Sequence, residues 1–244
     1  MLRYLKDKYY EWSTRGNEGI FTAPKNLKPL LDSEKSIVDA FHNLYYKSWQ
    51  EGRKTIDISW MGYRTLKCPL DLWFYQEILF ENQPDVIIET GTFLGGSAFY
   101  LAHLCGIIGK GRVISVDLQQ RSNLPQHTLI EYMTGSSTDP KIIAQLKEKT
   151  KGKTVMVILD SDHKKSHVLE ELNLYRELVS PGQYLIVEDS NINGNPTNLE
   201  HGPGPMEAIL EFLPQNPSFV VDKDRERFMM TLNPNGYLKK IQTQ

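Results

Sequence analysis

The sequence predicts an α/β fold: a doubly wound, mostly parallel sheet of seven strands, with a terminal antiparallel hairpin and a helical extension at the amino terminus. Three observations carry this prediction. From Asp85 onward, short β-branched segments alternate with helical segments, as in strands joined by crossover helices. A glycine-rich turn follows the first of these strands, and acidic residues follow four of them. The last two predicted strands are joined by a short charged turn, which indicates a hairpin.

Composition limits the classes of protein to consider. The chain has 244 residues, enough for one elaborated domain with a large core, and a net charge of -2 with mixed signs. Nothing in it indicates a nucleic-acid binder or a basic membrane patch. Its two cysteines, Cys68 and Cys105, are too few for a disulfide framework and wrongly spaced for a zinc knuckle. We find no signal peptide and no run of roughly 20 apolar residues, so we expect a cytoplasmic protein.

Residues 1–80 are predicted to form the helical extension, and residues 81–244 the sheet domain. Helices are expected at Ser33–Gln50, with Asp32 or Ser33 as cap, and at Pro69–Phe80. The first helix carries an apolar stripe, made of Ile37, Phe41, Leu44, Tyr45 and Trp49. Such a stripe packs on a sheet edge, makes a subunit contact or forms the wall of a substrate pocket, and the sequence leaves these alternatives open.

The first strand of the sheet is Val86–Ile88, with Glu89 at its end. Gly91, Gly95 and Gly96 open the following turn, and a helix is expected over Ser97–Leu104. A strand, a glycine turn and a helix start together form a cradle for a nucleoside, because small residues let the backbone approach the ligand. The order E-x-G-x-x-x-G-G lacks the phosphate-spaced glycines of a dinucleotide site, so we expect a ligand with a positive charge beside its nucleoside, which is S-adenosylmethionine.

The remaining elements follow in alternation. Strands are expected at Val113–Val116, Thr128–Met133, Val155–Leu159 and Tyr184–Val187; helices at Lys141–Lys149, His163–Leu178 and Met206–Leu213; a loop at Ser190–Pro205; and the hairpin at Phe219–Val221 and Phe228–Leu232. Asp139 and Pro140 are typical of a helix start. The loop is long enough to serve as a lid over the site, the alternative being a plain surface connection.

Carboxylates at the ends of parallel strands are expected to share one cleft, because ligands of such sheets bind there. They are Glu89, Asp117, Asp160, Glu188 and Asp189. Asp117 is placed to accept hydrogen bonds from the ribose hydroxyls, and Glu89 suits the methionine amino group. Three acids remain, and their mutual repulsion calls for a divalent cation, for which an all-oxygen set favours Mg²⁺ or Ca²⁺ over zinc. Glu188 and Asp189 can converge only if their strand breaks there.

The histidines allow other interpretations. His163 and His167 have the spacing of zinc ligands on one helix face, but the glutamate of an H-E-x-x-H motif is missing. A nonhaem iron hydroxylase usually shows a His-x-Asp or His-x-Glu pair, which the six histidines lack. His163 follows Asp160 at a predicted helix start, where it is either a general base or a supporting residue.

The chain resembles the cephalosporin hydroxylase family, whose members have a class I S-adenosylmethionine-dependent methyltransferase fold and include sugar O-methyltransferases of natural-product pathways. The shared motifs are Lys67–Trp73, Ile88–Thr92 with Gly95–Ser97, Ser136–Pro140, Leu159–His163 with His167, Val187–Asp189, Gly202–Pro205 and Asn233–Leu238. The resemblance implies a Mg²⁺ site, a cofactor site at the glycine turn, and homo-oligomers assembled partly through the amino-terminal section.

We therefore predict an O-methyltransferase acting on a hydroxylated small molecule, a sugar unit or a secondary metabolite, with Mg²⁺ lowering the pKa of the acceptor hydroxyl. The predicted cofactor-binding residues are Glu89, Gly91, Thr92, Gly95, Ser97, Asp117, Ser137 and Asp160; the metal ligands are Asp160, Glu188 and Asp189; the catalytic residues are Asp160 and His163. Competing classes are an iron-dependent hydroxylase, an NAD-dependent oxidoreductase and a catalytically silent binding protein.

Overall fold

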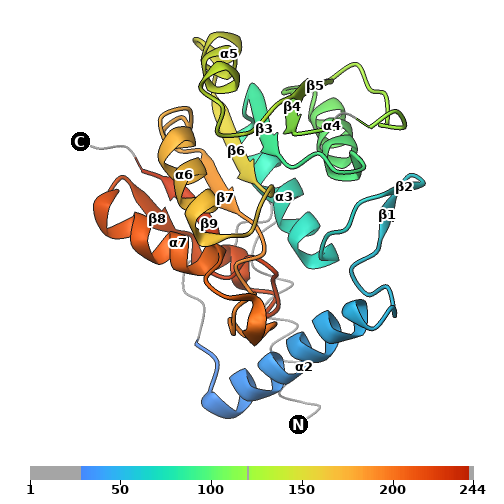
Figure 1. Cartoon of the computed structure of the whole chain (residues 1–244), viewed down its shortest axis with the longest axis vertical. Helices are drawn as coiled ribbons and strands as arrows, with labels where there is room; N and C mark the ends of the chain where they lie inside the picture. Colours follow the sequence, from blue (N-terminus) through green and yellow to red (C-terminus); the bar gives the residue numbers. More distant parts are fainter. Residues whose placement is uncertain (1–28, 120, 242–244) are drawn as a thin grey trace, which may run out of the picture.

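The protein is a three-layer α/β/α sandwich around one seven-stranded sheet. The computed structural model describes residues 29–119 and 121–241 (Figure 1). The strand order is β5-β4-β3-β6-β7-β9-β8, parallel from β5 through β7, with β9 antiparallel to both of its neighbours. The strands are β3 (Val86–Thr90), β4 (Val113–Asp117), β5 (Ile130–Thr134), β6 (Val155–Leu159), β7 (Tyr184–Val187), β8 (Phe219–Val221) and β9 (Tyr237–Lys240). The predicted doubly wound sheet is confirmed.

Helices cover both faces of the sheet and bury alternate strand residues. On one face lie α3 (Pro69–Asn82) and α4 (Gly96–Ile108), packed on Ile87, Met156 and Ile186. On the other lie α5 (Pro140–Thr150), α6 (Lys165–Tyr175) and α7 (Pro205–Phe212), packed on residues such as Ile88 and Val157. Because β6 and β7 are buried on both faces, they are continuous apolar runs, and their predicted bounds are confirmed.

Local capping explains several boundaries. α5 begins as predicted, with the Asp139 carboxylate accepting from the Lys141 N–H at 2.8 Å and Pro140 in the first turn. α4 extends beyond its predicted end and stops at Gly109, which has a φ of 77°. α6 is shorter than predicted and begins at Lys165, so His163 lies before the helix.

The amino-terminal helix α2 (Asp32–Gln50) crosses one end of the molecule, beside the loop that follows β7 (Figure 1). There the Asn191 side chain donates a hydrogen bond to His42 at 3.1 Å. The predicted cap at Asp32 or Ser33 is wrong. The cap position is Leu31, whose N–H donates a hydrogen bond to the Glu34 carboxylate at 2.8 Å.

The apolar stripe of α2 divides in two. Tyr45 and Trp49 pack on a small cluster of buried residues, Ile56, Cys68, Met230 and Leu232. In contrast, Ile37, Phe41 and Leu44 are 71%, 53% and 56% exposed. The aromatic residues before position 29 lie outside the described residues. A short antiparallel pair that the sequence did not indicate, β1 (Ser59–Trp60) and β2 (Tyr63–Arg64), follows α2 and packs on α4.

The predicted second strand of the terminal hairpin, Phe228–Leu232, is wrong. Phe228 instead stacks on Phe74 of α3 at 4.4 Å, and the Leu232 N–H is bonded to Asp71 at 2.9 Å. The partner of β8 is β9, which pairs with β7. Gly236 brings the chain there, because a Cβ at this position would lie 2.2 Å from the Val187 carbonyl oxygen.

The predicted division at residue 80 falls inside α3, whose buried face belongs to the core of the sheet, so the two-part organisation stays a prediction. None of the helices in residues 29–119 and 121–241 has both the length and the apolar character that a membrane span requires.

Candidate active site

The site lies at the switch point of the sheet, where β3 and β6 are neighbours and the chain leaves them toward opposite edges. Gly91 follows β3 with a φ of 90°, and a Cβ there would lie 1.8 Å from the carbonyl oxygen of Asp160, which follows β6. The Asp160 N–H donates to the Thr90 carbonyl at 3.0 Å. The two strand ends thus approach so closely that only glycine fits.

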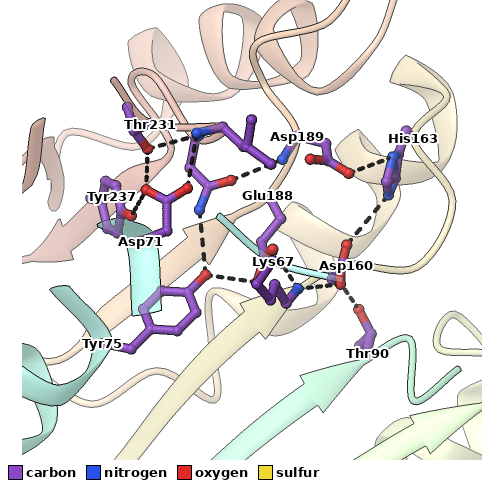
Figure 2. Close-up of polar contacts among 12 residues, drawn as sticks. Lys67, Asp71, Tyr75, Thr90, Asp160, His163, Glu188, Asp189, Thr231 and Tyr237 are labelled. Carbon is purple, nitrogen blue, oxygen red and sulfur yellow. Dashed lines mark hydrogen bonds and ion pairs between the residues drawn. The ribbon is translucent and has the colours of Figure 1, made fainter. Parts of the chain in front are cut away.

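The three acids predicted to bind a metal converge beside this point (Figure 2). Asp160 follows β6, and Glu188 and Asp189 follow β7. The required break in the strand is present: β7 ends at Val187, and Asp189 has a left-handed φ of 54°. The Asp189 N–H donates to the Asn233 side chain at 3.0 Å, which holds the turn.

A buried lysine accompanies these acids, and sequence reasoning gave it no role. The Lys67 ammonium donates to Asp160 Oδ2 and to Glu188 Oε2, and its side chain is 4% exposed (Figure 2). Burial alone lowers the pKa of Lys67, but the carboxylates of Asp160 and Glu188 outweigh burial and raise it. A lysine therefore supplies part of the compensating charge that we had assigned entirely to a metal ion. The one signal in the sequence that could have indicated a lysine here is that buried acids need a cation of some kind.

Glu188 is held on both oxygens. Lys67 binds Oε2, and the buried Tyr75 hydroxyl donates to Oε1 at 2.6 Å. Glu188 as a metal ligand stays a prediction, because an ion would have to take the place of one of these partners. Burial raises the pKa of Glu188, against the effect of Lys67.

His163 stands between the two aspartates. Its Nε2 lies 3.4 Å from Asp160 Oδ1, and its Nδ1 lies 3.3 Å from Asp189 Oδ2. Burial raises the pKa of Asp189, and His163 opposes this effect. His163 thus contacts the two carboxylates on the side away from Lys67 (Figure 2).

The zinc interpretation of the histidine pair is not supported by the positions of the rings. His167 lies on α6 and its Nε2 contacts the hydroxyls of Ser161 and Ser137, at 3.1 and 3.2 Å. A hydrogen bond to Glu171 raises the pKa of His167, against burial. The two histidines therefore serve different parts of the site.

A divalent cation fits the donor atoms. Asp160, His163 and Asp189 each offer one ligand atom, and these atoms lie within 4.8 Å of one another. The carboxylates of Asp160 and Asp189, which both contact His163, are suited to Mg²⁺, which is bound by one or two carboxylates and keeps other positions for water or substrate.

Two cavities meet at this point. The first, which we call the serine-rich cavity, has about 340 Å³ and is lined by Asp117, Ser136, Ser137, Thr138, Asp162 and His167. The second, the aromatic cavity, has about 320 Å³ and is lined by Tyr46, Trp49, Arg64, Asp160, His163 and Asp189. Gly91 and Ser161 line both. The predicted single cleft is therefore divided, with Asp117 on one side and two of the predicted metal ligands, Asp160 and Asp189, on the other.

The cofactor-binding residues predicted at and near the glycine turn have different positions relative to this junction. Thr92 and Ser97 line the aromatic cavity. Gly95 caps α4 with a φ of 75°, and a Cβ there would lie 2.7 Å from Pro125, so its visible role is to shape the turn. The Asp117 carboxylate accepts from the N–H groups of Phe93 and Gln119, at 2.9 and 3.1 Å.

Glu89 lies beneath the junction and is fully buried. Its Oε2 accepts from the Ser115 hydroxyl at 2.6 Å, and its Oε1 has no hydrogen-bond partner among the described residues. Burial raises the pKa of Glu89 to about 7, although Lys67 opposes the shift. An unpartnered buried carboxylate oxygen fits the predicted interaction with an amino group of a ligand, directly or through water.

The loop Ser190–Pro205 is held by hydrogen bonds within it and by one to α6. The Asn191 side chain donates to the Thr197 hydroxyl at 3.2 Å, and the Pro203 carbonyl accepts from the Lys165 N–H at 3.0 Å. Its residues are not among those that line the aromatic cavity, so the proposed lid stays a prediction.

Comparison with known proteins identifies relatives over most of the chain. Residues 53–241 match the family model described as Rhamnosyl O-methyltransferase/CmcI. Rhamnosyl O-methyltransferase of Mycobacterium tuberculosis strain H37Rv is 41% identical over 212 residues, which cover 83% of this chain and 84% of the relative. The Mycobacterium leprae protein of the same name is 39% identical over 211 residues, 83% of this chain and 90% of the relative.

Solved structures share the fold. A structure of CmcI with Mg and S-adenosylmethionine superposes with a TM-score of 0.61 and 18% identity, over 96% of this chain and 95% of that chain. An O-methyltransferase from Bacillus cereus in complex with S-adenosylhomocysteine gives 0.50 and 20% identity, over 78% of this chain and 83% of that chain.

Proposed function

Since the chain belongs to the Rhamnosyl O-methyltransferase/CmcI family, we propose that it transfers the methyl group of S-adenosylmethionine to a hydroxyl group of a sugar unit, with the help of Mg²⁺. The observation that carries this proposal is the junction of two cavities at Gly91 and Ser161, with Asp160, Asp189 and His163 on one side only. A cofactor in one cavity can thereby present its methyl group to an acceptor in the other.

The cofactor is assigned to the serine-rich cavity and the junction. Asp117 and Ser137 provide acceptors for the hydroxyls and amino groups of a nucleoside. Gly91 lets the backbone approach the ligand, and Ser97, Thr92 and Glu89 lie toward the methionine end. These assignments are supported by the lining residues and by the unpartnered oxygen of Glu89.

The acceptor is assigned to the aromatic cavity. Tyr46 and Trp49, with ring centroids 5.7 Å apart, offer flat apolar surface for a sugar ring, and the Arg64 guanidinium offers donors for its hydroxyls. The name of the mycobacterial relatives indicates a rhamnosyl unit. The name of these relatives and the aromatic lining of the cavity both support a sugar acceptor.

In the reaction, the acceptor oxygen forms a bond to the methyl carbon as the carbon–sulfur bond of the cofactor breaks, and the hydroxyl proton leaves. His163 lines the acceptor cavity and is the group that takes this proton. Asp160 and Asp189 hold the cation, with Glu188 as the further predicted ligand. Bound Mg²⁺ supplies Lewis-acid polarisation of the acceptor oxygen.

Purified enzyme incubated with S-adenosylmethionine, Mg²⁺ and a panel of glycosides tests the proposal. Mass spectrometry should find methylated rhamnosides and none of the methylated free aglycones. Trp49→Ala should raise the KM for the glycoside at unchanged affinity for S-adenosylhomocysteine. Phe41→Ala, on an exposed part of the same helix, should leave both values unchanged. His163→Ala should lower the rate by about 10²–10⁴-fold. Methylation of phenols but of no glycoside would contradict the sugar assignment.

We also propose that the protein forms homo-oligomers through α2. The exposed apolar side chains Ile37, Phe41 and Leu44 lie on one helix, and such a row supports a protein contact.

A further inference from the structure

Lys67 lies inside the acid cluster without taking part in the proposed reaction. Its ammonium group bridges Asp160 and Glu188, which are far from it in the sequence, and the side chain is almost fully buried (Figure 2). A buried lysine is costly unless it is paired, so its place among these acids calls for an explanation.

We propose that Lys67 is a positioning residue of the cation site: it holds Asp160 and Glu188 in place before the ion arrives, and it limits how tightly the ion binds. This inference rests on the proposed function, because it assumes that a divalent cation binds at Asp160 and Asp189. It concerns the protein without metal and its affinity for the cation. The rate of methyl transfer measures neither of these.

The hydrogen bonds divide the acid oxygens into two groups. Lys67 takes Asp160 Oδ2 and Glu188 Oε2, and Tyr75 takes Glu188 Oε1 at 2.6 Å. Asn233 donates to the Tyr75 hydroxyl at 3.3 Å and accepts from the Asp189 N–H at 3.0 Å, so one side chain connects both sides of the cluster. The oxygens left for an ion are Asp160 Oδ1 and those of Asp189, which face His163.

The charges explain the effect on affinity. Three carboxylates and one ammonium group leave a charge of -2, which one divalent cation neutralises. Lys67 pairs with both carboxylates and its side chain is only 4% exposed, so it remains in the cluster when the ion binds. It repels the ion and competes for Asp160 and Glu188, and this repulsion is strong because the charges are close together and partly shielded from solvent.

Removal of the lysine charge should therefore tighten cation binding. Mn²⁺ is a suitable probe, because electron paramagnetic resonance measures the free ion directly. Lys67→Met and Lys67→Gln should each lower the Kd for Mn²⁺ by at least about tenfold. Lys67→Arg, which keeps the charge, should stay near wild type. Lys164→Met removes an exposed cation close to His163 in sequence and should change the Kd by less than about threefold.

The stability of the empty site gives a second measurement. Without metal, Lys67→Met and Lys67→Gln should melt at a lower temperature than wild type, because Asp160 and Glu188 lose their partner, and Mn²⁺ should raise their Tm more than that of wild type. A lysine that served only to fill space would give lower Tm values without tighter Mn²⁺ binding.

The outcomes separate this inference from the proposed function. Methyl transfer by wild type, with Mn²⁺ affinity unchanged or weakened in both charge-removing variants, would overturn the role of Lys67 and leave the function standing. Tighter Mn²⁺ binding in these variants, with no methyl transfer to any acceptor by wild type, would support Lys67 and overturn the function. Absence of Mn²⁺ binding in every variant would overturn both.

Discussion

Replacement of Gly91 by alanine tests the close approach of β3 and β6 on which the site depends. The added Cβ would lie 1.8 Å from the Asp160 carbonyl oxygen, and the residue would keep a φ of 90°. A left-handed conformation costs an alanine about 1–2 kcal/mol, and overpacking in a rigid core costs about 1–3 kcal/mol. Because the obstructing atom belongs to the backbone, no side-chain rotation relieves the clash. We expect the free energy of unfolding to fall by about 2–5 kcal/mol.

Gly109→Ala is the matched control, since Gly109 has a φ of 77° and nothing within 4 Å of the added Cβ. It should lose only the conformational part, about 1–2 kcal/mol. Denaturant titrations give both values, and calorimetry should show weaker binding of S-adenosylhomocysteine for Gly91→Ala alone, because Gly91 lines both cavities. Equal losses of stability and unchanged binding in the two variants would refute the reasoning.

Three further predictions concern the cofactor, pH and assembly. Asp117→Ala should weaken S-adenosylhomocysteine binding by about 1.5–3 kcal/mol in calorimetry, since charge-assisted hydrogen bonds to the ribose are lost; an indifferent affinity would remove Asp117 from the site. Burial raises the folded-state pKa of Asp71 to about 7, against its hydrogen bonds. The contribution of Asp71 to stability is therefore fully present below the unfolded pKa and is lost as the pH rises through 7. The free energy of unfolding should fall by up to about 1.4 kcal/mol per pH unit, and denaturation of Asp71→Asn should not show this slope. Phe41→Asp should lower the oligomeric state in light scattering without loss of the fold, and a wild type that is monomeric at micromolar concentration would contradict assembly through α2.

The bounds of β6 and β7 were predictable because these strands have only one possible environment. Val155–Leu159 and Tyr184–Val187 are apolar throughout and flanked by turn residues, so their burial on both faces follows from composition. The last strand was not predictable in this way. Tyr237–Lys240 is half polar, and its place is fixed by Gly236 against Val187, a contact between residues distant in the sequence.

The site shows the same contrast. The acids were found because each lies at or just after the carboxyl end of a strand, and parallel strands end at one edge. Lys67 was missed because its two partners are 93 and 121 positions away, and no local pattern connects them. The shared helix face assumed for His163 and His167 depended on a helix start at His163, whereas the Asp162 carboxylate accepts from the Lys164 N–H at 2.9 Å and the helix begins at Lys165.

Metal dependence of methyl transfer tests the central claim most directly. The rate of transfer of a labelled methyl group to a rhamnoside should be followed with Mg²⁺, with EDTA, and with Mg²⁺ restored, while calorimetry follows S-adenosylhomocysteine binding under each condition. We expect EDTA to abolish transfer and leave cofactor binding intact, Mg²⁺ to restore transfer, and Asp189→Asn to behave like chelation, with partial rescue at high Mg²⁺. Full activity in EDTA, with no metal in the purified protein, would contradict the account.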